Sequence, residues 1–191
     1  MIRRVVLSAL LLAGLGAGRE LVLNGDFERA PGFGWRDSAW GNFPDTGNCR
    51  LRWLHDLEPD RDFEVMVHKM LHQGYRLEQR VDVADLDLGF SASCRLNVKT
   101  ELESLYAAGA VCLEYLDRAG TVLGETRIYA ATSGCDWQPG PTLHLIEAPD
   151  SVNWYDYHLL VDQELDSLPG VPRDSVRSVN VVVLSFVLGN C

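Results

Sequence analysis

A strict alternation of apolar and polar residues over residues 88–98 is the feature that most constrains how this chain can fold. A period of two places the apolar side chains on one face of a β-strand and the polar ones on the other. The segment is therefore expected to be a strand of a sheet that packs on one side only. The inward set is Leu88, Phe90, Ala92, Cys94, Leu96 and Val98, and the outward set is Ser91, Ser93, Arg95 and Asn97.

Short segments of the same kind recur along the chain, whereas long helical periodicity is absent. Short strands joined by polar loops are typical of an all-β sandwich or jelly roll. Asp117 and Gly120 bracket a tight turn between two apolar runs and predict a hairpin there. The best helix candidate is Glu101–Ala108. The predicted strands are Leu21–Leu23, Cys49–Leu54, Phe63–Lys69, Arg76–Val83, Leu88–Val98, Gly109–Leu116, Val122–Ala130, Trp154–Val161 and Val176–Leu188.

The N-terminal segment has the pattern of a secretion signal peptide. Two arginines precede an apolar run over residues 5–15, and small residues then offer a cleavage site after Gly18. The run is too short to span a membrane, as is Val179–Leu188. We therefore expect a leader helix over residues 1–18 and a secreted protein, extracellular or periplasmic, with no membrane span and one domain over residues 19–191. A buried N-terminal helix is the alternative.

Charge and cysteine usage restrict the partners and the compartment. The formal net charge is −10, and a nucleic-acid partner is not expected because phosphate binding needs clustered Lys and Arg. The five cysteines would sit in an oxidising compartment after export, and an odd number leaves at least one of them unpaired. The alternation places Cys94 inward and Cys112 outward, so we expect no disulfide between these two.

Several segments, in the order in which they occur, carry a family resemblance. They are Leu21-Val22-Leu23-Asn24-Gly25-Asp26-Phe27-Glu28 followed by Trp35, then Leu77–Val83, Leu113–Gly120, Trp154-Tyr155-Asp156-Tyr157 and Val176–Leu188. Together they resemble the galactose-binding-like jelly rolls, especially carbohydrate-binding modules of families four, nine, sixteen and twenty-two. The resemblance implies an antiparallel β-sandwich with jelly-roll topology over residues 19–191.

The same resemblance implies one further strand that carries an aspartate. The chain reaches Cys191 before such a strand begins. Either the chain is a fragment or one sheet keeps an open edge, which is a pairing hazard.

A structural calcium near the first strand is also implied by the resemblance. Glu28 matches the glutamate of the family motif, and Asp26 lies close to it in the sequence. Calcium takes six to eight oxygen ligands, and the late aspartate is missing here. The alternative is that Asn24-Gly25-Asp26 forms a turn held by local side-chain bonds.

Sugar binding is expected to depend on exposed aromatic rings, because a flat ring covers the apolar face of a pyranose. Trp40 and Trp137 lie in polar loops, and Trp53 has a strand parity that fits either the core or a sheet face. Arg95 and Asn97, on the outward face of the long strand, are the candidate hydrogen-bonding residues. Trp35 and Trp154 match motif positions that pack structurally. For every ring, partial burial in the core is the alternative.

Catalytic motifs are poor, so an enzyme is not expected. Glu164-Leu165-Asp166 begins like the E-x-D-x-x-E motif of jelly-roll glycosidases, but Pro169 stands where the motif has its final glutamate. The expected function is a secreted, non-catalytic module that recognises a polysaccharide or another glycan, attached to a larger enzyme or surface protein. The alternative is a structural or adhesive jelly-roll domain without a sugar site.

Overall fold

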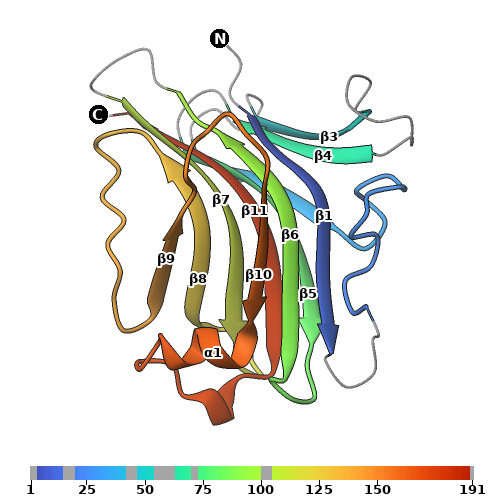
Figure 1. Cartoon of the computed structure of the whole chain (residues 1–191), viewed down its shortest axis with the longest axis vertical. Coiled ribbons are helices and arrows are strands. Elements are labelled where there is room, and N and C mark those ends of the chain that lie inside the picture. Colours follow the sequence, from blue (N-terminus) through green and yellow to red (C-terminus); the bar gives the residue numbers. More distant parts are fainter. Residues whose placement is uncertain are drawn as a thin grey trace.

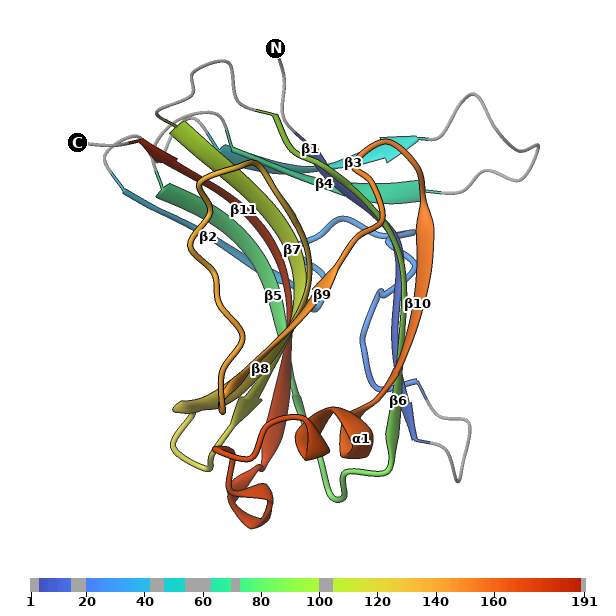
Figure 2. The same cartoon turned by 60° about the vertical axis from the view of Figure 1, so that its left-hand side comes forward.

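The computed structural model describes residues 4–14, 20–41, 47–53, 63–69, 73–99 and 105–189. The described chain is mostly β-strand, arranged in two sheets that face each other (Figures 1 and 2). The first sheet contains, in spatial order, β2 (Arg36–Trp40), β5 (Gln73–Asp82), β11 (Ser178–Gly189), β7 (Leu105–Leu116), β8 (Val122–Ala131) and β9 (Leu143–Glu147). The second contains β10 (Tyr155–Leu160), β6 (Leu88–Asn97), β1 (Arg4–Gly14), β4 (Phe63–Lys69) and β3 (Gly47–Trp53).

The main core lies between the two sheets. Leu77, Val111 and Val181 enter it from the six-stranded sheet, and Val65 and Phe90 enter it from the second sheet. The alternation predicted for residues 88–98 is confirmed along β6, where buried and half-buried residues follow each other without interruption. The inward positions of the strands therefore supply the core, as a period of two requires.

The pairing is not antiparallel throughout, so the expectation of a purely antiparallel fold is wrong at one edge. β9 runs parallel to β8, with Glu125 beside Leu143 and Tyr129 beside Glu147. After β8 ends, the chain returns along the sheet through residues 132–142 before β9 begins (Figure 2). A connection of this length lets the next strand start at the same end as the previous one, which a two-residue turn cannot do.

The segment predicted as the first strand, Leu21–Leu23, is a turn instead. The Gln79 side chain takes the place of a strand partner: Leu23 N donates to Gln79 Oε1 at 2.6 Å, and Gln79 Nε2 donates to Leu23 O at 2.9 Å. Asn24 and Phe27 both have positive φ angles, 53° and 55°, which end any extended run. Phe27 is fully buried beside Trp35, so these two aromatic residues of the motif pack into the core.

Other elements also depart from the sequence-based assignment. The helix candidate Glu101–Ala108 is strand from Leu105 onward, as part of β7. β2 and β9 are short edge strands that the sequence analysis did not predict. A one-turn helix, α1 (Val161–Asp166), and a 3₁₀ turn, η2 (Arg173–Ser175), follow β10. No helix in the described ranges is long and apolar enough to cross a membrane.

β1 lies between β6 and β4 and pairs antiparallel with both. From the sequence we expect a leader helix in this segment, whereas the structure, which includes the segment, has a strand there. A signal peptide is removed from the mature protein. The conformation of this segment in the uncleaved chain therefore does not test cleavage, and the signal peptide over residues 1–18 stays a prediction.

The described cysteines follow the predicted parity. Cys94 lies in the main core, whereas Cys112 is buried on the opposite side of the six-stranded sheet with Ala110 and Val182. The described cysteines, which exclude Cys191, form no disulfide. The predicted parity of Cys94 and Cys112 is therefore confirmed.

Candidate functional site

The outer face of the six-stranded sheet, which points away from the main core, carries a groove. Two hollows of about 230 and about 450 Å³ meet at Arg76 and Glu114, and we call them the aromatic hollow and the polar hollow of the outer groove. The aromatic hollow is lined by Trp40, Arg76, Cys112, Glu114, Glu125, Arg127, Trp137, Val182, Leu184 and Phe186. The polar hollow is lined by Gly34, Arg36, Arg76, Glu78, Gln79, Arg80, Glu114, Leu116, Gly120, Val122 and Asn180.

Strand register brings the outward side chains of the groove together in rows. Leu184 on β11 is flanked by Arg76 on β5 and by Ala110 on β7. One row further along, Val182 lies between Glu78 and Cys112. Residues that are distant in sequence thus share one surface because their strands are neighbours in the sheet.

Trp40 forms one wall of the aromatic hollow. It stands at the end of edge strand β2, where its partner in the ladder is Gly74. A Cβ added at Gly74 would lie 2.1 Å from Cζ2 of Trp40, so only glycine leaves room for the indole to lie across β5. The ring then reaches Phe186, at a centroid distance of 6.3 Å, and keeps 37% of its surface exposed.

Trp137 forms the opposite wall. It comes from the connection between β8 and β9, and its ring lies 5.8 Å from that of Tyr129. The Arg127 guanidinium stacks 4.4 Å above the Trp137 ring, and Glu125 holds that guanidinium through contacts of 2.5 and 2.7 Å. Burial lowers the pKa of Arg127, but the hydrogen bond to Glu125 and the nearby negative charges together raise it above its ordinary value.

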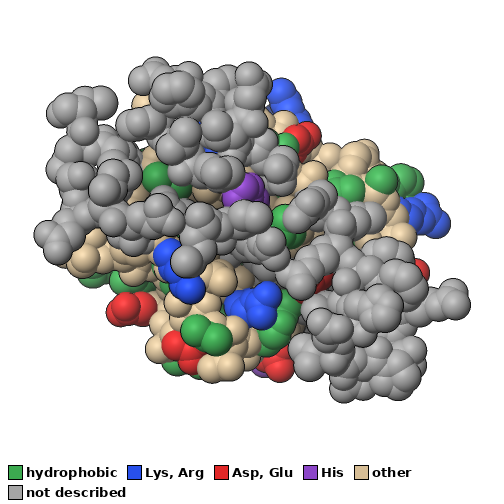
Figure 3. All heavy atoms as spheres, turned by 90° about the horizontal axis from the view of Figure 1, so that it is seen from above, with side chains coloured by type: hydrophobic (Ala, Val, Ile, Leu, Met, Phe, Trp, Pro, Cys, Tyr) green, Lys and Arg blue, Asp and Glu red, His purple; other side chains and the backbone are tan. Residues whose placement is uncertain are grey.

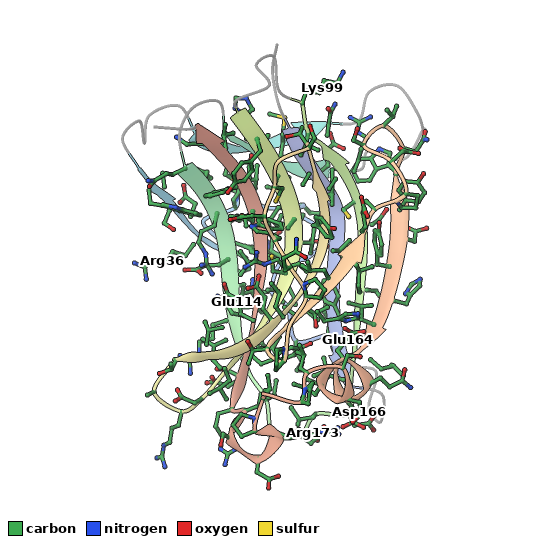
Figure 4. The ribbon with its side chains drawn as sticks, turned by 90° about the vertical axis from the view of Figure 1, so that its left-hand side faces the viewer. Arg36, Lys99, Glu114, Glu164, Asp166 and Arg173 are labelled. Atoms are coloured by element: carbon green, nitrogen blue, oxygen red, sulfur yellow. The ribbon has the colours of Figure 1, made fainter. Side chains whose placement is uncertain are left out.

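Where the two hollows meet, and along the polar hollow, the floor is a cluster of charged and amide groups. Arg76 Nη2 donates to both carboxylate oxygens of Glu114, at 3.0 and 2.9 Å, and lies 2.6 Å from Glu78 Oε2. Asn180 Nδ2 donates to Glu114 Oε2 at 2.8 Å and to Glu78 Oε2 at 3.1 Å. Figure 4 shows Glu114 on the six-stranded sheet and Arg36 beyond the sheet edge. The groove therefore combines aromatic walls with a polar floor.

Two of the residues predicted for sugar binding meet in this groove, namely Trp40 and Trp137. Arg95 and Asn97 lie on β6 in the other sheet, where Arg95 stacks over Trp154 at 5.7 Å. Trp53 ends β3 of that same sheet, and its side chain lies outside the described residues. The structure does not bring these three residues together with the two groove tryptophans.

Sequence reasoning missed several groove residues, above all Gly74, Phe186, Arg76 and Asn180. A usable signal for two of them was present, because Asn180 and Phe186 share the outward parity of the predicted strand Val176–Leu188. Gly74 carried no such signal, since its role depends on a tryptophan from a strand that was not predicted.

Asp26 and Glu28, the predicted calcium ligands, are both exposed. Asp26 Oδ1 accepts a bond from the backbone N–H of Glu28 at 3.3 Å, and Asn24 Oδ1 accepts one from Arg29 N at 2.9 Å. Such local bonds fit the alternative of a turn stabilised by its own side chains. Within the part of the chain that the structure describes, no group of three or more His, Cys, Asp or Glu residues is placed to hold a metal. Calcium binding stays a prediction.

The two carboxylates of the incomplete glycosidase motif point in different directions. Glu164 is buried, accepts a bond from Thr126 Oγ1 at 3.1 Å and contacts His144 Nδ1 at 2.7 Å. Asp166 is exposed and pairs with Arg173 at 2.5 Å. Figure 4 shows Glu164, Asp166 and Arg173 around α1, away from Glu114. These carboxylates anchor α1 and the turn that follows it.

Charge on the rest of the surface is mixed where it can be seen. In the view from above, the described acidic and basic side chains are interspersed and form no large patch of one sign (Figure 3).

No protein-family model matches this chain, and a search of curated proteins finds no significant match. The function must therefore be argued from the outer groove itself.

Proposed function

We propose that this protein is a secreted, non-catalytic carbohydrate-binding module that holds a polysaccharide or another glycan in the outer groove. The observation that carries the proposal is that Trp40 and Trp137, from two distant segments, line one hollow that opens at Arg76 and Glu114 into a second, polar hollow. Each indole can cover the apolar face of a sugar ring, while the floor provides donors and acceptors for hydroxyl groups.

The proposal includes a jelly-roll fold. In support of it, successive strands switch between the two sheets: β4 and β6 belong to the second sheet, and β5 and β7 belong to the first. β11, late in the chain, lies between β5 and β7 rather than at an edge. Non-sequential neighbours of this kind are typical of Greek-key and jelly-roll topologies.

Export and calcium are separate parts of the proposal. Loss of residues 1–18 from the exported protein, measured by intact mass, would support secretion, and an uncleaved chain would contradict it. A structural calcium near Asp26 and Glu28 would raise the melting temperature, since a ligand that binds only the folded state stabilises it. An identical melting curve in calcium and in chelator would remove the metal from the proposal.

The experiment that tests sugar binding compares two double variants by affinity electrophoresis in gels that contain soluble polysaccharides. Trp40→Ala with Trp137→Ala should weaken retention at least about tenfold, since two stacking rings together supply more than about 1.4 kcal/mol. Arg95→Ala with Asn97→Ala, on the other sheet, should change retention less than about twofold. Both variants are first checked for a wild-type circular dichroism spectrum.

Two outcomes would count against the proposal. If the wild-type chain is retained by none of the polysaccharides, a structural or adhesive domain becomes the better interpretation. If the Arg95 and Asn97 variant loses retention while the tryptophan variant keeps it, sugar binds to the second sheet and not to the outer groove.

A further inference from the structure

We propose that the outer groove selects an uncharged polysaccharide chain that lies along the strands. Arg76 Nε and Asn180 Oδ1 together bind one hydroxyl group of a sugar ring. This inference rests on the proposed function and adds the substrate class and two residues that contact it. Three observations support it: the internal pairing of the charges, two polar atoms without partners, and the length of the groove.

The charges at the centre of the groove are already paired with each other. Glu114 binds Arg76, Glu78 lies 2.6 Å from the same guanidinium, and Glu125 binds Arg127. At the centre of the groove, an acidic glycan would bring further negative charge against three carboxylates whose cations are already engaged. Arg36 and Arg80 also line the polar hollow, but both are exposed, so salt screens their charge. A cationic ligand would in turn compete with Arg76 and Arg127 for these carboxylates. An uncharged ligand leaves the pairs intact and adds no repulsion.

Two atoms of this cluster keep unused hydrogen-bonding capacity. Within the described chain, Arg76 Nε and Asn180 Oδ1 are buried and have no hydrogen-bond partner. Asn180 is only 6% exposed. Both side chains donate to the same atom, Glu114 Oε2, so the unused donor and the unused acceptor belong to one compact cluster in the polar hollow. A buried polar group without a partner costs about 1–3 kcal/mol, which a suitable ligand group would relieve.

A hydroxyl group is the ligand group that matches this pair. It can accept a bond from the Arg76 Nε–H and donate its own proton to Asn180 Oδ1. An ionised carboxylate cannot donate to Oδ1, and an ammonium group cannot accept from Nε–H. Because neither atom is open to solvent in the free protein, binding requires a small rotation of the Arg76 and Asn180 side chains.

The groove is long enough for the interior of a chain. The aromatic hollow begins beside Gly74, and the polar hollow extends to Arg80 on the same strand. At about 3.3 Å per residue, this stretch of β5 spans about 20 Å. The two hollows share Arg76 and Glu114, so one extended ligand can occupy both.

The first test uses polysaccharides with one backbone and different charge: hydroxyethyl cellulose against carboxymethyl cellulose, next to uncharged xylan and mannan and to polygalacturonate. We expect at least one uncharged polymer to retard the intact protein. We also expect any binding to the cellulose backbone to fall at least tenfold on carboxymethylation. Equal or tighter binding to the acidic polymers would overturn the inference while leaving the proposed function intact. Retardation by no polymer at all would remove both.

The second test isolates the Nε–H group. Arg76→Lys keeps a cation beside Glu78 and Glu114 but has no atom equivalent to Nε, so affinity for the best uncharged polymer should fall at least fivefold. The matched control, Arg95→Lys on the other sheet, should stay within twofold. The melting temperature of each variant separates lost binding from lost folding. Wild-type affinity of a folded Arg76→Lys variant would contradict the proposed bond between Arg76 Nε and the sugar hydroxyl.

Discussion

The outward faces of the two sheets follow the same alternation of side chains, but their outward side chains differ in how deeply they are buried. On β6, the outward residues are half-buried small polar groups, together with Arg95 stacked on Trp154. On β7 and β11, the outward residues Cys112 and Val182 are 1% and 2% exposed. They are covered from above by Trp137, which the connection between β8 and β9 places over them.

This difference shows how a sheet face becomes a site. Alternation determines which side chains point outward. A site that is shielded from solvent also needs side chains from other elements beside the sheet face. Here edge strand β2 supplies Trp40 on one side and the 132–142 connection supplies Trp137 on the other. Enclosure also removes water from the charged groups on the floor, which strengthens their interactions with each other.

The sharpest way to examine this contrast is a matched pair of arginine truncations. Arg76→Ala should destabilise the fold by about 2 kcal/mol, because it leaves Glu114 and Glu78 partly buried without their cation. Arg95→Ala should cost less than about 1 kcal/mol, since its described contact is a stacking one over Trp154. Urea unfolding followed by circular dichroism measures both, and equal costs would mean that the two faces do not differ in enclosure.

A smaller effect is expected from Gly74→Ala. The added methyl group would overlap the Trp40 ring, so the ring must move away from β5 at a cost of about 1 kcal/mol. The emission of Trp40 should shift, and sugar retention should weaken together with it. Gly32→Ala is the control, since nothing lies within 4 Å of a Cβ at that position and stability should be unchanged. An unaltered emission spectrum for Gly74→Ala would mean that Trp40 does not lie over this glycine.

The smallest effect concerns thiol reactivity, which compares Cys94 in the main core with Cys112 on the outer face of the six-stranded sheet. Burial, followed by the charge of Asp156, raises the pKa of Cys94 to about 12, and burial raises that of Cys112 as well. A raised pKa keeps a thiol protonated and therefore less reactive. Iodoacetamide should label the half-buried Cys135 first and reach Cys94 and Cys112 only on unfolding, as peptide mass mapping would show. Rapid labelling of Cys112 in the native protein would mean that the outer groove is open to its floor.

Much of the strand content was predictable because local sequence carries the pattern. Phe63–Lys69 is strand β4 with the predicted bounds, and the inward set of β6 is buried as expected. The errors fall where a tertiary partner replaces local preference. Leu23 forms a turn because Gln79, from another strand, satisfies its backbone groups. β2 was missed because an exposed edge strand has no apolar alternation to reveal it.

The candidate site was predictable only in part. Trp40 and Trp137 stood out because both were expected to lie in polar loops, where exposed aromatic residues are found. That expectation is wrong for Trp40, which ends strand β2, whereas Trp137 does lie in the connection between β8 and β9. Arg95 and Asn97 were chosen for the correct reason, outward parity, but parity does not say which sheet a strand joins. Phe186 and Asn180 had the same parity and lie in the groove.

The local sequence pattern is enough to show that the chain is built mainly of strands and which side chains of the alternating strands face the core, because these properties repeat every two residues and need no distant partner. Tertiary structure decided which outward faces became a groove. The pairing of β11 with both β5 and β7 brings Arg76, Asn180 and Glu114 together, and a long connection carries Trp137 back over the neighbouring Cys112 and Val182. Such contacts depend on strand order in space, which local patterns do not encode.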